Sequence, residues 1–538
     1  MASPNQDPRR VARGTSRAVV CALAWLALFA SSCRPPGSKD SGTHDHSGPH
    51  TQSPPAASQS AAPDRAKQRK VVELRNQPTE RPPVSASSPS ETLPSLPTLS
   101  WDETDEQVAP PAGSYAPGRP PRFDDRRLAQ AGIRKLTGRY LVLYTDLPPS
   151  RAVDELPRVF DAAVPQFRRY FGIDAARLAN WKIVGCVMAD KQRFRAAGLL
   201  DPSLPEFENG YQLGWQLWVC DKPSDYYRRH LLLHEAVHAF MNHFLGAAGP
   251  PWYMEGMAEM LALHRWHDGN LTINILPPAN REVWLWGRIK IIREAIRRGD
   301  WKSLQDVFAY GPTAHRDVAA YAYSWAACLF LSRHPHYRDA FGDLPKLVRR
   351  PADFVDAVAK SFSSNDGELR EDWQVFLQEV DYEFSFEGCV IRRRPVATLE
   401  SGKATFQLDP QSGWQSTGIE LEAGATYLVE ARGEVRIRPG SPDWTTRPAG
   451  ITIHYHRGRP LGMLLYAIGA REPAVGVRSP LLDPLALGDR IRIRPASDGV
   501  LFVRLNEPAG QLGDNDGSMQ IDVGRSTGPT SDQPDHAR

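Results

Sequence analysis

The sequence predicts an α+β protein in which a mixed domain with many helices precedes an all-β domain. Between residues 126 and 228, apolar strand-like runs alternate with amphipathic helical patterns, and from about 228 to 386 the pattern is helical. From 404 to 523, short β-rich runs are separated by glycine, proline and aspartate turns, as in a β-sandwich. A chain of 538 residues is too long for one hydrophobic core, so we expect two folded domains.

The N-terminus has the features of an export signal. Arginines precede an apolar run over residues 18–30, and small residues then lead to Cys33. Small residues directly before a cysteine resemble a bacterial lipobox, although Ala30 stands where leucine is preferred. We therefore expect a signal peptide over 1–33 and a lipid on Cys33 that anchors an exported protein to the membrane of the bacterial cell envelope. Ordinary secretion and an uncleaved anchor are the alternatives.

Residues 34–125 are expected to form a disordered linker. The stretch from 34 to 120 holds 16 of the 47 prolines and few bulky apolar residues. Such a composition cannot bury enough apolar surface to offset the entropy lost on ordering. Behind a lipidated cysteine, the linker would act as a tether between the membrane and the folded domains. At the other end, residues 525–538 are expected to form a flexible tail.

The first folded domain, 126–390, is expected to contain three strands and several helices. Apolar runs predict strands over 140–144 and 181–188, and an amphipathic pattern predicts a helix over 152–171. The alternating segment 211–219 also predicts a strand. Because a metal-binding helix follows it closely, this strand is a candidate edge for binding an extended peptide, with an ordinary sheet strand as the alternative.

Charge and cysteine content exclude two kinds of site. A net charge of +3 provides no basic field of the kind that nucleic-acid binding needs, so we expect no nucleic-acid partner. The four cysteines outside the signal region lack CxxC spacing, which argues against a cysteine zinc site. A disulfide between Cys186 and Cys220 is conceivable after export, and buried free thiols are the alternative.

The strongest chemical signal is the HExxH sequence at residues 234–238. In a helix, His234 and His238 lie one turn apart on the same face, where both imidazoles can bind one Zn²⁺ ion. The helix predicted over 229–245 is apolar on most sides, so it should be buried, and Gly246 should end it. The pattern thus predicts a zinc site inside the first domain.

A second helix should complete the ligand set. Pro251 is suited to the first position of a helix, where its missing N–H costs little. That helix presents Glu255 and Glu259 one turn apart. We expect Glu255 to be the third zinc ligand, with water in the fourth position, and Glu259 to orient a histidine ring.

These residues predict hydrolysis of a peptide or protein substrate. Glu235, next to the first ligand, would act as the general base toward a zinc-activated water molecule. A hydrogen-bond donor is also needed for the oxyanion of the tetrahedral intermediate. Tyr323 and Tyr321 are the candidates, with His315 third, and core packing is the alternative role for the tyrosines.

The sequence of the second helix also carries a family resemblance. Glu-Gly-x-Ala-Glu at residues 255–259, after HExxH, resembles the gluzincins, which include thermolysin-like, aminopeptidase and collagenase metallopeptidases. The wider context, at 226–235, 250–252 and 286–288, resembles a peptidase-MA-like family of exported bacterial proteins of unknown function. This resemblance covers roughly residues 135–385. It implies a zincin-like metallopeptidase fold and a metal site, and it implies no particular substrate.

The second domain, 404–524, follows a linker at 391–403 and contains a loop rich in oxygen-bearing side chains. This loop, at 506–517, lies between two β runs and suits a Ca²⁺ site. It resembles the calcium loop of galactose-binding PA-I-type bacterial lectins, which are jelly-roll sandwiches. The resemblance implies that Ca²⁺ binds the side chains of Glu507, Asp514 and Asn515 and the backbone carbonyl of Gln511, and that glycans are partners. Glu507 replaces the family's aspartate, and Gln511 replaces its usual threonine. An acidic hairpin loop on a plain sandwich is the alternative.

Two functions are therefore open. The first is an exported zinc metallopeptidase that a lectin-like sandwich brings to a glycan or glycoprotein. The second is a carbohydrate-binding surface protein whose peptidase-like domain is a catalytically silent scaffold.

Overall fold

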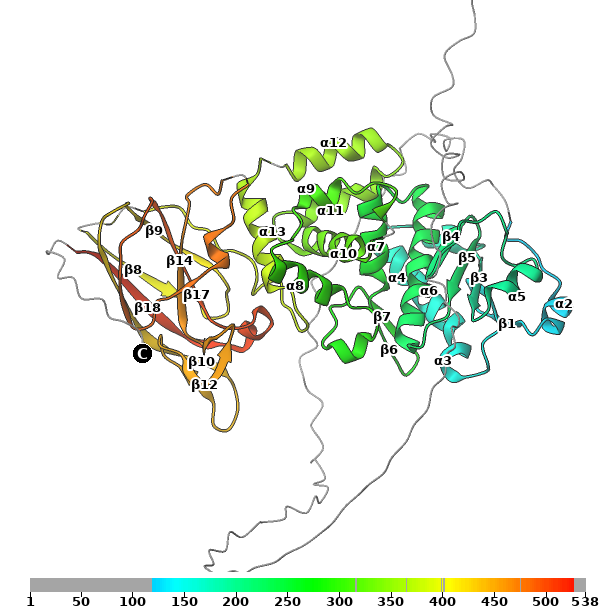
Figure 1. Cartoon of the computed structure of the whole chain (residues 1–538), viewed down its shortest axis with the longest axis horizontal. Coiled ribbons are helices and arrows are strands. Elements are labelled where there is room, and N and C mark those ends of the chain that lie inside the picture. The colour runs from blue at the N-terminus through cyan, green and yellow to red at the C-terminus, as the bar shows by residue number, and fades with distance from the viewer. Residues whose placement is uncertain are drawn as a thin grey trace, which may run out of the picture. The chain divides into compact units, whose positions relative to one another are not determined.

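A computed structural model describes residues 119–526 except for 315, 316, 364, 398, 400, 401 and 475. The predicted signal peptide, Cys33 and nearly all of the predicted linker and tail lie outside the described residues. The described residues all belong to one compact unit. They form both helices and sheets, as expected for the α+β class (Figure 1). Within this part of the chain, no helix combines the length and the apolar character that crossing a membrane requires.

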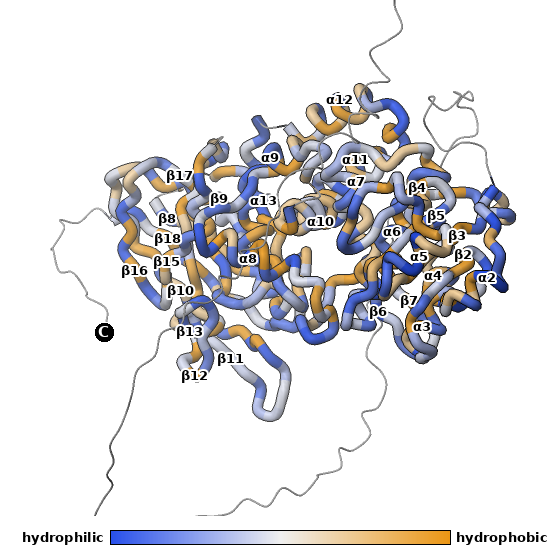
Figure 2. The backbone as a smooth tube through the Cα atoms, turned by 45° about the vertical axis from the view of Figure 1, so that its right-hand side comes forward, coloured by the Kyte–Doolittle hydropathy of each residue, from blue (hydrophilic) through white to orange (hydrophobic). Residues whose placement is uncertain are grey.

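The first domain is built on a five-stranded sheet with the spatial order β1-β2-β3-β5-β4. Strands β2, β3 and β5 are parallel, and β1 and β4 pair antiparallel at the two edges. Strand β3 is buried along its whole length, and Figure 2 colours β2 and β3 mainly orange for apolar residues. The strands are β1 (Arg134–Thr137), β2 (Leu141–Thr145), β3 (Ile183–Met188), β4 (Gly210–Leu213) and β5 (Gln216–Cys220).

The segment 211–219 forms a hairpin and not the single strand that its alternation predicted. The chain turns at Gly214, whose φ of 57° is in the left-handed region that glycine adopts readily. Strand β4 is consequently the edge of the sheet, and it pairs on one side only, with β5. The two strands alternate in phase with each other, so periodicity alone did not reveal the turn.

Two helices of this domain pack against each other and against the sheet: α4 (Leu156–Tyr170) contacts β2, and α6 (Asp225–Phe240) contacts β4 and β5. The predicted helix 152–171 is divided at Glu155 into a short α3 (Arg151–Asp154) and α4. Ser150 caps α3 by accepting a hydrogen bond from the Val153 backbone N–H, and Pro157 lies in the first turn of α4.

The predicted end of the HExxH helix and the start of the next helix are confirmed, whereas the HExxH helix begins at Asp225, four residues before the predicted Arg229. Helix α6 continues as one π-helical turn, Met241–Leu245, and ends at Gly246, whose φ is 80°. Helix α7 (Pro251–Ala262) begins at Pro251. A short hairpin of β6 (His264–His267) and β7 (Asn270–Ile273) then follows, which the helical pattern of this region did not predict.

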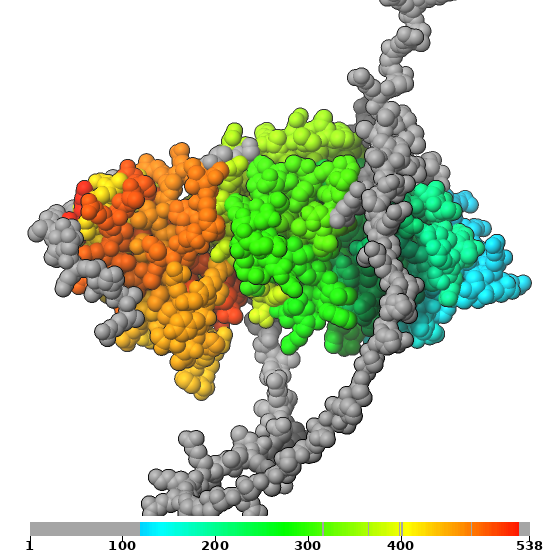
Figure 3. Space-filling view, in the orientation of Figure 1, coloured from blue at the N-terminus to red at the C-terminus, as the bar shows by residue number. Residues whose placement is uncertain are grey.

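Helix α10 is buried on almost all sides and packs against α7 and α8. Figure 3 shows the residues of α12 at the surface of the visible face, in agreement with the exposure of most of its side chains. The further helices of the first domain are α2 (Asp125–Gln130), α5 (Lys191–Ala196), α8 (Arg288–Arg298), α9 (Leu304–Phe308), α10 (Val318–Arg333), α11 (Arg338–Asp343), α12 (Pro351–Ser361) and α13 (Gly367–Glu379).

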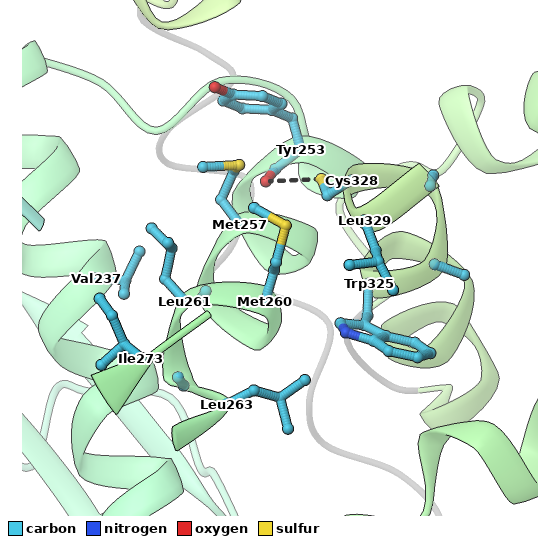
Figure 4. Close-up of a cluster of buried hydrophobic side chains, with 14 of the residues drawn as sticks. Val237, Tyr253, Met257, Met260, Leu261, Leu263, Ile273, Trp325, Cys328 and Leu329 are labelled. Carbon is cyan, nitrogen blue, oxygen red and sulfur yellow. Dashed lines mark hydrogen bonds between the residues drawn. The ribbon is translucent and has the colours of Figure 1, made fainter. Parts of the chain in front are cut away.

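The contact between α7 and α10 is unusually close at Gly256. A Cβ atom there would lie 2.8 Å from the backbone carbonyl carbon of Ser324 and 2.5 Å from Sγ of Cys328. Figure 4 shows apolar side chains of the two helices facing one another, among them Met260 of α7 and Trp325 of α10. Glycine is therefore the residue that lets the two helix backbones approach.

The cysteines of the described residues are free thiols. Cys186 lies in β3 opposite Trp218 of β5, whereas Cys220 pairs with Met188. The two cysteines are thus out of register, so the disulfide considered from the sequence is not formed.

Between residues 403 and 525, the regular structure of the described chain consists of β strands and two short 3₁₀ turns. One sheet has the order β11-β10-β18-β8, with β16 also paired to β10, and the other has the order β15-β14-β17-β9. All these pairs are antiparallel, and buried side chains of both sheets form one core. The strands are β8 (Lys403–Leu408), β9 (Gln415–Leu421), β10 (Tyr427–Arg438), β11 (Trp444–Thr446), β12 (Ile451–His456), β13 (Arg459–Leu461), β14 (Leu464–Gly469), β15 (Leu485–Ala486), β16 (Arg490–Ile493), β17 (Gly499–Leu505) and β18 (Asp516–Arg525).

Candidate metal centre

Helix α6 presents the two histidines of the HExxH motif toward α7. Ser224 caps this helix, because its hydroxyl accepts a hydrogen bond of 3.1 Å from the Tyr227 backbone N–H. One turn separates His234 from His238, and both side chains are buried. The cap and the helical spacing together fix the direction in which the imidazoles point.

Three potential ligand atoms converge between the two helices. Nε2 of His234 lies 3.1 Å from Nε2 of His238 and 3.2 Å from Oε2 of Glu255. The third side of the triangle, from His238 Nε2 to the same carboxylate oxygen, measures 3.6 Å. Tetrahedral Zn²⁺ with bonds of about 2.1 Å keeps its ligand atoms about 3.4 Å apart, so these separations suit a zinc ion.

Hydrogen bonds among these three side chains do not satisfy all three of the converging atoms. A neutral imidazole has one N–H, so if His238 donates from Nε2 to His234, the His234 ring presents only a lone pair to Glu255. A cation at the centre of the triangle would accept a lone pair from each of the three groups. The residues therefore fit a metal ion, and the donor set of two imidazoles and one carboxylate suits zinc.

Glu255 is electrostatically prepared to bind a cation. Burial alone would raise its pKa, but His238 and His234 outweigh burial and lower the pKa to about 2. The carboxylate is consequently ionised at neutral pH, in the form that coordinates a metal.

Glu235 lies next to the triangle, and its environment differs from that of Glu255. Burial raises the pKa of Glu235 to about 8, and the nearby charge of Glu255 acts in the same direction. The edge strand β4 covers this carboxylate: a Cβ atom on Gly210 would lie 2.8 Å from Cδ of Glu235. Glu235 thus occupies a tight, desolvated position between α6 and the edge of the sheet.

Glu259, one turn after Glu255, is held by hydrogen-bond donors around it. Arg288 donates to both of its oxygens, at 2.8 and 3.1 Å, and the indole N–H of Trp286 donates at 3.0 Å. Burial would raise the pKa of Glu259, but Arg288 and His230 hold the pKa well below its usual range. One carboxylate oxygen lies 3.5 Å from Nδ1 of His234, on the side of the ring opposite the triangle. Glu259 is therefore placed to orient the His234 ring.

The structure separates the candidate oxyanion donors. The ring of Tyr321 lies 6.2 Å from that of His234, and Arg288 lies over it at 5.4 Å. Burial and the Glu255 carboxylate both raise the pKa of Tyr321, which keeps its hydroxyl protonated. The side chain of Tyr323 is buried, and Lys302 and Asp300 are among the groups that act on its hydroxyl. His315 lies outside the described residues.

Residues outside the HExxH motif and the Glu-Gly-x-Ala-Glu segment complete the centre. His230 lies one turn before His234 and 3.4 Å from Glu259, and its Nδ1 lies 3.2 Å from the Ala262 carbonyl. Arg288 and Gly210 come from parts of the chain that are distant in sequence. The four-residue spacing of the three histidines on α6 could have indicated His230. The contacts of Arg288 and Gly210 depend on tertiary packing.

The residues of the predicted calcium loop also lie near one another, between β17 and β18. Asn515 donates from Nδ2 to Glu507 at 2.8 Å, and both side chains are buried. Burial raises the pKa of Glu507 to about 7, and Asp514 is close enough to act in the same direction. The Oδ1 atom of Asn515 is buried without a hydrogen-bond partner. Gln511, whose backbone carbonyl is the fourth expected ligand, lies in one 3₁₀ turn with Asp514, Ala509–Asp514.

Comparison with known proteins gives no family assignment. No family model and no curated protein matches the sequence. One similar solved structure is the N-terminal domain of EclA, a PllA-like lectin, with a TM-score of 0.19, 19% identity, and coverage of 24% of this chain and 100% of that one. Another is the IMPa metallopeptidase in complex with T-antigen, with a TM-score of 0.14, 11% identity, and coverage of 65% of this chain and 38% of that one. This chain therefore spans well under two thirds of the length of that metallopeptidase. At these scores neither similarity establishes a fold or an activity.

Proposed function

We propose that the chain is a zinc-dependent metallopeptidase with a zincin-like catalytic domain. The single observation that carries this proposal is the triangle of His234, His238 and Glu255, whose ligand atoms are 3.1 to 3.6 Å apart. Three protein ligands leave one coordination position for water, as hydrolytic zinc sites require. When bound, zinc would polarise a substrate carbonyl and lower the pKa of water.

Glu235 is the proposed general base. Its burial disfavours the charged form, so the carboxylate readily holds a proton that it has accepted. A base with a pKa near the working pH can accept a proton from water and later deliver it to the leaving amine. The position of Glu235 beside the triangle, and not within it, leaves its oxygens available for this transfer.

The edge strand β4 is the proposed site for the substrate backbone. It pairs with β5 on one side only, and Gly210 at its start lies against Glu235. An extended peptide that adds to this edge would bring a scissile amide close to the general base. Tyr321 is the proposed donor to the oxyanion, since its protonated hydroxyl belongs to a ring beside His234.

The test combines zinc analysis with cleavage of a broad peptide library. Wild-type protein should bind zinc and cleave peptides, and Glu235→Gln should keep the zinc while losing activity by about 10²- to 10⁴-fold. Replacing both His234 and His238 by alanine should remove the zinc bound at this centre. The proposal fails if this zinc is absent from the wild type, or if wild type and Glu235→Gln cleave equally well.

A second function is proposed for the β domain, as a jelly-roll, lectin-like module that binds Ca²⁺ and a glycan. The supporting observation is the Oδ1 atom of Asn515, which is buried without a hydrogen-bond partner. Nδ2 of the same side chain donates to the buried carboxylate of Glu507. A buried acceptor and a buried carboxylate of raised pKa are the groups that a bound cation would stabilise. Arg438 links this loop to an aromatic pair. Its positive charge lowers the pKa of Glu507, and its guanidinium carbon lies 4.7 Å from the centroid of the Trp444 ring. Trp444 in turn contacts the ring of His454.

Calcium titration and a glycan array test this second function. Calcium should raise the unfolding temperature of the wild type, and Asp514→Asn and Asn515→Ala should weaken this effect. Glycan binding should require calcium. Binding of calcium without any glycan would leave the module as a structural calcium domain, and the absence of both would remove this function. A carbohydrate-binding protein whose peptidase-like domain is catalytically silent would bind glycans and cleave no peptide.

Export and lipid anchoring form part of the proposal. Their support is the N-terminal sequence alone, an arginine-rich start and an apolar run before Cys33. Radiolabelled fatty acid should be incorporated into wild type and not into Cys33→Ala.

A further inference from the structure

A second cluster of potential metal ligands lies at the end of α10, apart from the HExxH centre. His334 is the C-cap residue of α10, His336 follows two residues later, and Asp372 lies on α13. One ligand atom from each of the three residues falls within 4.8 Å of the other two. His334 and Asp372 are buried, and His336 is exposed to solvent.

The His334 ring has an unsatisfied nitrogen. Its Nε2 atom is buried without a hydrogen-bond partner and lies 3.6 Å from Oδ2 of Asp372, which is too far for a hydrogen bond. Burial of a polar atom without a partner costs free energy, so such atoms are rare in folded proteins. A cation between this nitrogen and the carboxylate would satisfy both atoms.

The charges around Asp372 also favour a cation. Arg393 contacts three carboxylates, Asp372 at 2.8 Å, Glu371 at 3.0 Å and Glu368 at 3.8 Å. One guanidinium group therefore faces three negative charges, and two of these, on Glu371 and Asp372, are buried. Buried charge without sufficient compensation is costly, and a divalent cation would supply the missing positive charge.

We propose that His334, His336 and Asp372 bind a divalent transition-metal ion of the zinc class. Two imidazoles and one carboxylate form a donor set that zinc prefers, and solvent at the exposed His336 would supply water as the fourth ligand. The carboxylate is already oriented: the Tyr337 hydroxyl donates to Oδ2 at 2.8 Å, and Arg393 donates to Oδ1. Oδ2 has a second lone pair, so it can accept the hydrogen bond from Tyr337 and coordinate the ion at the same time.

Only a weak contact opposes coordination by the His334 ring. The backbone N–H of His336 donates to Nδ1 of His334 at 3.4 Å, beyond the usual range for such bonds. Loss of this contact would allow Nδ1 to carry the proton while Nε2 binds the metal.

The ion would have a structural role. It would connect the end of α10, the helix that carries Tyr321, to α13. Helix α13 in turn contacts the β domain, because Glu371 accepts a hydrogen bond of 2.7 Å from the Ser479 hydroxyl. The second metal would therefore stabilise the junction of the two domains.

The test measures zinc bound per full-length chain in wild type and in His336→Ala, after removal of metal with a chelator and back-titration. His336 is exposed, so its replacement should leave the fold intact. We expect His336→Ala to bind one zinc fewer than the wild type, or to bind it at least about tenfold more weakly. Zinc should also raise the unfolding temperature of the wild type more than that of the variant.

His267→Ala is the matched control, because His267 is exposed and lies on the distant strand β6. It should bind as much zinc as the wild type. The comparison is independent of the HExxH centre: if that centre binds no zinc, the wild type should still bind one ion and His336→Ala none. Equal zinc content and equal affinity in the wild type and His336→Ala would overturn the proposal.

Discussion

Glu255 and Glu259 lie one turn apart on the same helix, and their neighbours give them different chemistry. Glu255 faces the two imidazoles of the HExxH motif, whereas Glu259 is held by Arg288 and Trp286. A carboxylate already bonded to an arginine and an indole has few lone pairs left for a metal. The environment of each carboxylate, more than its place in the motif, therefore favours Glu255 as the proposed zinc ligand and Glu259 as the group that orients the His234 ring.

A methyl group added at Gly210 should contact Glu235, the proposed general base. Its φ is not in the left-handed region, so alanine fits the backbone, but the new Cβ would lie 2.8 Å from Cδ of Glu235. The flexible glutamate should move while the fold persists. We expect Gly210→Ala to lower kcat/KM by about 10²-fold with zinc content unchanged. Gly311→Ala is the control, since a Cβ there meets nothing within 4 Å. Equal activity of the two variants would contradict the placement of Glu235 against β4.

The two tyrosines of α10 should differ in their effect on catalysis. Tyr321→Phe removes the hydroxyl of the ring that lies 6.2 Å from the His234 ring, and it should lower kcat by about 10²-fold with little change in KM. Tyr323→Phe removes a hydroxyl near Lys302 and should leave kcat nearly unchanged. Steady-state kinetics of both variants distinguish the roles, and a larger loss in Tyr323→Phe would refute this assignment.

Spacing in the sequence predicted which residues approach one another at the metal centre, and it did not decide between the two tyrosines named as oxyanion donors. The four-residue interval in HExxH fixes His234 and His238 on one face of any helix. Helix α10, by contrast, is apolar on all sides, so its sequence does not show which face meets the metal centre. Only its packing against α7 and α8 turns Tyr321, and not Tyr323, toward His234.

At the scale of elements, the metal centre depends on how closely α7 approaches α10. Gly256 follows the proposed ligand Glu255 directly and lies against the Ser324 backbone. Any side chain at this position would push the two helices apart, and α7 would then shift relative to α6. The position of Glu255 against the two histidines is thus linked to the packing of a third helix.

Gly256→Ala should test this dependence. Because the new Cβ would meet backbone atoms of Ser324 that cannot move easily, we expect destabilisation of about 1–3 kcal/mol. Zinc affinity at the HExxH centre should fall as well, since Glu255 moves with the helix. Denaturant unfolding and zinc titration measure the two effects. Unchanged stability together with unchanged affinity would show that the helices do not need this close approach.

Element ends were predicted better than hairpins. Gly246 and Pro251 mark the end of one helix and the start of the next through local backbone preferences that need no tertiary partner. The β4–β5 and β6–β7 hairpins were missed because their strands are only four or five residues long. Over so few residues, strand and helix patterns overlap, and pairing with a neighbouring strand decides between them.

At the scale of the whole molecule, buried ion pairs connect the helical domain to the β domain. Glu379, at the end of α13, accepts a hydrogen bond from Arg504 of β17 at 2.7 Å and from Arg457 at 2.9 Å. Burial would raise the pKa of Glu379, but the two arginines lower it below its usual value. This carboxylate should therefore contribute to stability while it is ionised.

Glu379→Gln should show this contribution through its pH dependence. At pH 7 the variant should be less stable than the wild type by about 3 kcal/mol, because two arginines lose their partner. The folded-state pKa is depressed, so the contribution is complete above the unfolded pKa near 4.3 and is lost as the pH falls through the lower folded value. Denaturant midpoints of the two proteins should converge toward pH 3. A constant difference between pH 7 and pH 3 would exclude ionisation of Glu379 as its cause.

The sequence by itself determined the α+β class, the change to an all-β region near residue 404, and the candidates His234, Glu235, His238 and Glu255. These features follow from local periodicity and spacing, which act over a few residues. Tertiary structure alone decided the position of Gly210 over Glu235, the approach of the Tyr321 ring to His234, and the cluster of His334, His336 and Asp372. Each of these contacts joins segments that are distant in the sequence, and only the packing of whole helices and strands brings them together.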